Sequence, residues 1–216
     1  SDLELERGVA EASEFFHEPS RNPLRDPRVT LTIGDARTLL EHTQERYGLI
    51  ISEPSNPWLA GVNNLFTVDF YRRVRSRLEP DGVFCQWMQL YEISPETIRS
   101  MMASFLEVFP EGDVYAVWRA VDVVLVASPG GRKLSLDRLR SPEVRRMLDA
   151  ANIARPEDVA SYWSAPMSAL APVARGAAFN RDDLPLVEYR APRDLVAVGR
   201  ASLTGAPEVA RLVPFD

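Results

Sequence analysis

The stretch "YGLIISEPSNPWLAG", Tyr47–Gly61, decides how the rest of the chain is interpreted. It begins as an apolar run and passes without a break into Glu53, two prolines and Asn56. Apolar residues on both faces are typical of a buried strand in a parallel sheet. Proline fixes one backbone angle and therefore stiffens the segment after the strand. We predict a buried parallel strand over 48–53, followed by a rigid loop that holds a carboxylate and an amide at the end of the sheet.

Strand and helix patterns alternate on both sides of this stretch. Apolar runs typical of strands lie at 2–6, 28–35, 48–53 and 82–88, and helical spacing occurs at 6–16, 36–47, 67–78 and 94–109. Two further strands, 113–119 and 121–128, flank a very short turn, which is a hairpin signal. The alternation predicts an α/β fold whose parallel sheet has an antiparallel edge hairpin. We predict this α/β domain over residues 1–128 and a small helical or loop extension over 129–216 that packs on it.

The composition excludes several classes of protein. The chain has 216 residues, 45% hydrophobic content and a net charge of -6, without a sustained basic stripe, so nucleic acid is not expected as a partner. One cysteine and two histidines do not favour a His/Cys metal site, and we predict no metal cofactor. The low cysteine content fits the cytoplasm. The sequence contains no apolar run of membrane-spanning length.

Acidic residues close three successive strand patterns: Glu4 and Glu6, then Asp35, then Glu53. Ligands of open α/β sheets bind beyond the carboxyl ends of the strands. A carboxylate there can accept hydrogen bonds from a ribose diol or an adenine amine, and one beside an amide can accept a proton from an amine substrate. The alternative is that such acids only cap helices, since Asp35 directly precedes a helical pattern.

These motifs resemble a known family. From Leu3 to about Val126, the chain resembles spermidine synthases and related polyamine aminopropyltransferases, through "LELERGVAEASEFF", "DPRVTLTIGDARTLL", the opening stretch and "LEPDGVFCQW". The resemblance implies a Rossmann-like fold of the S-adenosylmethionine-dependent transferases. It implies decarboxylated S-adenosylmethionine as co-substrate, or S-adenosylmethionine itself. By this resemblance Glu4 and Glu6 bind the ribose, Asp35 binds the adenine amine, and Glu53 is the catalytic base.

The chain departs from the family pattern at two places. Glu53 stands where the family has its catalytic aspartate, and Asn56 stands where a second aspartate grips the cationic amine. The family's first strand and glycine-rich loop would precede Asp2, so we expect the fold to lack its first strand. A sheet without an inner strand exposes unpaired backbone groups, which rearrangement or a second chain, as in a homodimer, would cover.

The segment "FNRDDLPLVEYRAPRDL" resembles the C-terminal part of bacterial spermidine-synthase-like proteins, some of which carry a multi-span membrane region. Asp182 and Asp183 are candidates to face the amine and replace the charge missing at Asn56. The alternative is a rigid turn capped by aspartates and followed by an edge strand. Trp58, which follows two prolines, is a candidate wall of the substrate pocket.

Two classes of function follow from these features. The first is aminopropyl transfer from decarboxylated S-adenosylmethionine to an amine. The second is a non-catalytic domain that binds a nucleoside or a partner, including as the cytosolic part of a membrane protein. A small-molecule methyltransferase is a further enzyme alternative.

Overall fold

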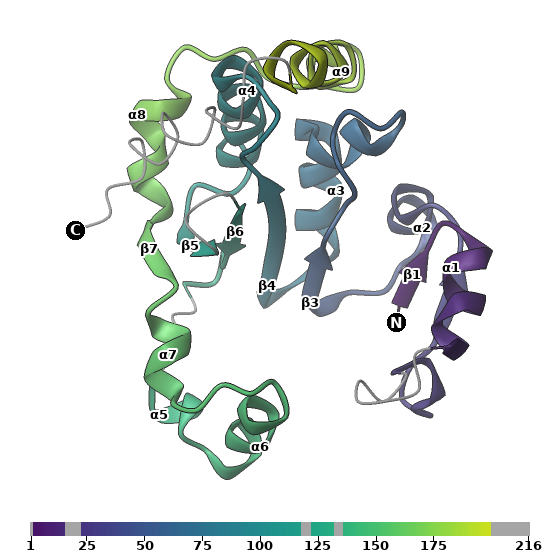
Figure 1. The fold of residues 1–216 in the computed structure, drawn as a ribbon, viewed down its shortest axis with the longest axis vertical. Coiled ribbons are helices and arrows are strands. Elements are labelled where there is room, and N and C mark those ends of the chain that lie inside the picture. Colours follow the sequence, from purple (N-terminus) through teal and green to yellow (C-terminus); the bar gives the residue numbers. More distant parts are fainter. Residues whose placement is uncertain (1, 16–22, 118–121, 132–135, 200–216) are drawn as a thin grey trace. The chain divides into compact units, whose positions relative to one another are not determined.

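A computed structural model describes residues 2–15, 23–117, 122–131 and 136–199 of the chain. It divides into two compact units, Ser1–Glu45 and Arg46–Asp216, which we call the N-terminal and C-terminal units. Figure 1 labels most of the helices and strands of both. Mixed α/β architecture, predicted from the alternating patterns, is confirmed.

The N-terminal unit is a two-stranded parallel sheet with short helices. Its elements are β1 (Asp2–Glu4), α1 (Arg7–Ala12), the 3-10 turns η1 (Ser13–Phe15) and η2 (Pro23–Arg25), β2 (Leu31–Ile33) and α2 (Ala36–His42). β1 pairs with β2 from Asp2 opposite Leu31 to Glu4 opposite Ile33. Because the strands are parallel, the acidic residues that follow them lie at the same edge.

The C-terminal unit contains a five-stranded sheet in the order β3-β4-β6-β5-β7. Its strands are β3 (Tyr47–Ser52), β4 (Leu78–Gln89), β5 (Gly112–Val117), β6 (Asp122–Ala127) and β7 (Trp163–Pro166). β3 is parallel to β4, whereas β4/β6, β5/β6 and β5/β7 are antiparallel. The predicted hairpin of β5 and β6 is confirmed, and its turn lies outside the described residues.

One face of this sheet carries the core. The 3-10 turn η3 (Val62–Phe66) leads into α3 (Val68–Arg77), and α4 (Pro95–Leu106) follows β4. Figure 1 labels α3, β4 and α4. Thr67 and Ser94 cap these helices by accepting hydrogen bonds from backbone N–H groups in the first turn. Aromatic side chains from α3, β4 and the end of α4 pack together, with ring centroids 5.1 to 6.5 Å apart: Phe70, Tyr71, Phe84, Phe105 and Phe109.

The other face of the sheet corrects one prediction. β3 is not buried on both faces, since Leu49 and Ile51 are 54% and 66% exposed. Among the described strands β3 pairs only with β4, so it forms an edge of the five-stranded sheet. An apolar run thus identified a parallel strand correctly but did not determine its neighbours, which tertiary structure sets.

The segment after residue 128 contributes a strand to the five-stranded sheet. It contains α5 (Leu136–Leu139), α6 (Pro142–Ala150), α7 (Pro156–Ala160), β7, the 3-10 turn η4 (Met167–Leu170), α8 (Ala171–Ala174) and α9 (Leu186–Gly199). β7 pairs with β5, and the boundary between the two compact units falls after Glu45. No helix among the described residues is long and apolar enough to cross a bilayer.

The predicted edge strand after the aspartates is wrong, because that segment is helix α9. Val187 and Ala191 are four residues apart and both fully buried, which is the spacing of one helical face. β7, earlier in the chain, occupies the sheet edge instead. The alternation of polar and apolar residues was too short to separate the two structures.

Candidate functional site

The N-terminal unit brings its acidic residues together. The Gly34 N–H donates to the Glu4 backbone carbonyl at 3.0 Å, so Asp35 follows directly beside the end of β1. Glu4 Oε1 accepts from the Glu6 N–H at 2.9 Å, and Asp35 Oδ1 accepts from the Thr38 N–H at 2.8 Å. Asp35 therefore caps α2, as the alternative reading predicted. Capping uses one carboxylate oxygen and is compatible with a ligand hydrogen bond to the other.

In the C-terminal unit, Glu53 immediately follows β3 and its side chain is exposed. Ser52, the last residue of β3, lies opposite Gln86 on β4, so Glu53 stands at the carboxyl edge of two parallel strands. Pro54 and Pro57 are both buried, which anchors the loop by packing as well as by restricted backbone angles. The predicted rigid loop is therefore held at the end of the sheet, with the carboxylate facing solvent.

The same loop contacts Tyr91, two residues beyond the end of β4. A side-chain hydrogen bond joins Asn56 to Tyr91, and the Trp58 and Tyr91 rings meet edge to face with centroids 6.4 Å apart. Burial and the negative charge of Asp122 raise the pKa of Tyr91, and the Asn56 hydrogen bond partly opposes them. Tyr91 thus contacts the loop and also experiences the charge of Asp122.

Two further polar side chains at this edge went unrecognised in the sequence. Asp122, the first residue of β6, lies opposite Gln89, the last residue of β4. Burial raises the pKa of Asp122, and its Oδ1 is buried without a hydrogen-bond partner in the part of the chain that is described. Gln89 is fully buried, and its Nε2 donates to the Tyr91 carbonyl at 3.3 Å. The sequence held one signal for Asp122, namely an acid at the first position of the second hairpin strand. Because β6 runs antiparallel to β4, its first residue lies beside the last residue of β4.

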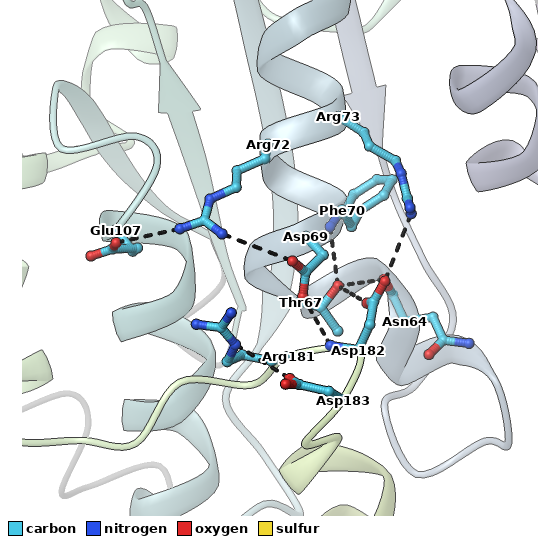
Figure 2. Close-up of polar contacts among 10 residues, drawn as sticks. All are labelled: Asn64, Thr67, Asp69, Phe70, Arg72, Arg73, Glu107, Arg181, Asp182 and Asp183. Carbon is cyan, nitrogen blue, oxygen red and sulfur yellow. Dashed lines mark hydrogen bonds and ion pairs between the residues drawn. The ribbon is translucent and has the colours of Figure 1, made fainter.

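Asp182 and Asp183 make other contacts, shown in Figure 2. The Thr67 hydroxyl donates to Asp182 Oδ1 at 2.8 Å, and Arg73 lies 3.7 Å from Asp182 Oδ2. Asp183 pairs with Arg181 at 3.3 Å. The contacts of Asp182 tie the segment to the N-cap and body of α3.

Asn180 and Glu188 hold the same segment against the loop. The fully buried Asn180 donates through Nδ2 to the carbonyls of Asn63 and Phe66, and its Oδ1 accepts from the Val187 N–H. Glu188 accepts from Asn63 Nδ2 and from the Gly61 N–H. The segment 180–188 therefore holds η3 in place. η3 continues the loop that carries Asn56 and Trp58.

The structure brings the predicted site residues together in two groups. Glu4, Glu6 and Asp35 belong to the N-terminal unit, whereas Glu53, Asn56 and Trp58 lie at one edge of the C-terminal sheet. Within the described ranges, no group of three or more His, Cys, Asp or Glu side chains is placed to hold a metal ion.

The chain is similar in sequence to enzymes that act on polyamines or putrescine by name. A polyamine aminopropyltransferase from Synechococcus is 39% identical over 77 residues, which are 35% of this chain and 25% of the relative. Putrescine N-methyltransferase 2 from Nicotiana tabacum is 30% identical over 120 residues, 55% of this chain and 33% of that enzyme. The chain thus matches only about a quarter to a third of the length of these relatives.

Solved structures agree on the fold. The crystal structure of a probable spermidine synthase from Corynebacterium glutamicum superposes with a TM-score of 0.53 at 22% identity, over 83% of this chain and 62% of that one. The family model described as the spermine/spermidine synthase domain matches residues 4–121, more than half of the chain. The chain therefore belongs to the spermine/spermidine synthase family.

Proposed function

We propose that this chain carries part of an aminopropyltransferase, which moves an aminopropyl group from decarboxylated S-adenosylmethionine to a small amine. The observation that carries the proposal is family membership together with acidic residues at the carboxyl ends of both parallel strand pairs. This is the edge at which α/β sheets bind their ligands.

In this proposal the acids of the N-terminal unit hold the nucleoside. Glu4 and Glu6 accept hydrogen bonds from the ribose diol, and Asp35 accepts from the adenine amine. The neutral acceptor amine attacks the carbon beside the sulfonium, a C–N bond forms, the C–S bond breaks, and methylthioadenosine leaves. Glu53 takes the proton released by the amine, for which its exposed position at the strand end is suited.

We propose a polyamine or a related small amine as the acceptor. Relatives of this chain are named for polyamines or for putrescine, which supports this class. Trp58 forms a wall of the acceptor pocket and Asn56 lines it. Asp182 and Asp183 stay candidates for acceptor binding, although their contacts with Thr67, Arg73 and Arg181 favour a structural role.

The test of transfer identifies the product formed from the acceptor. Incubation with putrescine and either decarboxylated S-adenosylmethionine or S-adenosylmethionine, followed by mass spectrometry, distinguishes aminopropyl from methyl transfer. We expect aminopropyl product, and we expect Glu53→Gln to abolish it. Glu79→Gln is the control, because Glu79 is exposed near the amino end of β4. Methyl product alone, or transfer unaffected by Glu53→Gln, would refute the proposal.

Nucleoside binding is tested separately by calorimetry with methylthioadenosine. We expect Glu4→Gln and Asp35→Asn to weaken binding, and Asn can still cap α2, so the second variant should fold. Asp26→Asn is the matched control because Asp26 is held by Arg28 and precedes β2, whereas Asp35 follows that strand. Equal affinities in all variants would remove these acids from the site.

We further propose that the protein acts in the cytoplasm and self-associates. Among the described strands, β3 has a partner on one side only, and exposed Leu49 and Ile51 lie on it. Unpaired strand edges favour association with another chain. Light scattering on dilute protein should give a dimer mass, and a monomer at all concentrations would contradict self-association.

A further inference from the structure

Three segments of the C-terminal unit meet around Tyr91: the loop after β3, the end of β4 and the start of β6. Asn56 and Trp58 come from the loop after β3, Tyr91 itself follows β4, and Asp122 opens β6. Gln89 ends β4 opposite Asp122. All of these residues lie at the edge of the sheet where Glu53 stands.

The sheet register sets Asp122 and Gln89 side by side. Directly opposed residues of an antiparallel pair project to the same face, with Cβ atoms roughly 4.5–5.5 Å apart. Both carry an oxygen that is buried and has no hydrogen-bond donor in the described part of the chain, Asp122 Oδ1 and Gln89 Oε1. Buried acceptors are ordinarily satisfied, so a neighbouring pair that has no donor among the described residues is suited to a ligand that brings N–H groups.

The chemistry of the surrounding side chains selects a cation. A carboxylate and an amide oxygen both accept hydrogen bonds. The Tyr91 and Trp58 rings, whose centroids are 6.4 Å apart, offer aromatic faces that attract an ammonium group. An alkylammonium satisfies both acceptors and neutralises the carboxylate. An anionic ligand would meet only repulsion from Asp122 and from Glu92, whose charge also acts on Tyr91.

We propose that Asp122, together with Gln89 and the Tyr91 and Trp58 rings, binds the charged, non-reacting amino group of a diamine acceptor. Asp122 thereby supplies the negative charge that is missing at Asn56. The inference rests on the proposed amine-acceptor function. Three carboxylates of the segment 180–188 are held elsewhere: Asp182 by Thr67, Asp183 by Arg181 and Glu188 by Asn63.

Amine binding provides a test that does not depend on transfer. The affinity of the intact protein for putrescine, which has two amino groups, is compared with its affinity for n-butylamine, which has one, by calorimetry. We expect the wild type to prefer the diamine by about tenfold, the value of one partly buried charge-assisted hydrogen bond. Asp122→Asn should erase this preference. Asp137→Asn, an equal charge change at a side chain that is 97% exposed, should keep it.

Two further measurements separate binding from folding. Asp122→Asn should not lower the melting temperature, whereas loss of a merely structural carboxylate would lower it. Adding Asn56→Asp to Asp122→Asn should restore part of the diamine preference, because both side chains act on Tyr91.

The outcomes distinguish this inference from the proposed function. If putrescine preference is lost in Asp122→Asn but no variant transfers any group, the amine subsite stands and the transferase proposal fails. If the wild type transfers an aminopropyl group and Asp122→Asn keeps the full preference for the diamine, the subsite is refuted. A wild type that binds neither amine also refutes it.

Discussion

Replacing Asn180 by alanine should strongly destabilise the C-terminal unit. Asn180 is fully buried, and its side chain makes three hydrogen bonds to backbone groups. Its Nδ2 donates to the carbonyls of Asn63 and Phe66 at 3.3 and 3.2 Å, and its Oδ1 accepts from the Val187 N–H at 3.2 Å. These bonds join η3 to the first turn of α9.

The magnitude follows from the groups left without partners. Truncation leaves two buried carbonyls and one buried N–H unsatisfied, and each such group costs about 1–3 kcal/mol before relaxation. Partial relaxation reduces the sum, so we expect the free energy of unfolding to fall by about 3–5 kcal/mol, which is exceptional for one substitution. The Asn180 backbone bonds to Ser104 and Val68 are unaffected by the change.

Urea denaturation of the wild type and the variant, followed by circular dichroism, measures this difference. Asp183→Ala is the matched control, because its side chain is 81% exposed and pairs only with Arg181 among the described contacts. A surface pair of this kind contributes about 0–1 kcal/mol. A loss below about 1 kcal/mol for Asn180→Ala, or equal losses in both variants, would refute the view that the tail anchors the loop.

Three other perturbations have defined outcomes. Asp122→Asn should flatten the dependence of stability on pH. Burial raises the pKa of Asp122 above its ordinary 3.8, so the folded protein holds that proton more tightly and stability falls as pH rises through the raised value; an unchanged pH profile in melting scans would contradict this. Gly61→Ala should cost about 1–2 kcal/mol in urea denaturation, since Gly61 has φ +84° and a new Cβ meets nothing, which leaves backbone strain alone; Gly61→Asn should cost less. Ser94→Ala should reduce the free energy of unfolding by about 1–2 kcal/mol and so lower the melting temperature, because it removes the cap of α4 and a hydrogen bond to Asp194. An unchanged melting temperature would contradict this role of the cap.

The sequence by itself determined the local elements and the family of this chain. Proline and serine at 94–95 marked the start of α4, and apolar runs marked β3 and β4, because capping and periodicity depend on neighbouring residues only. The acids after β1, β2 and β3 were recognisable for the same reason, since a parallel strand places its following residue at a common edge.

Only the tertiary structure decided which distant residues meet. The exposure of Ile51, the helix over Leu186–Gly199 and the anchoring of η3 by Asn180 depend on strand order and long-range packing, which short-range patterns do not encode. Asp122 became a candidate ligand-binding residue only when antiparallel pairing set it opposite Gln89 and near Tyr91. Register, a property of two strands rather than one, therefore brought these residues of the candidate acceptor site together.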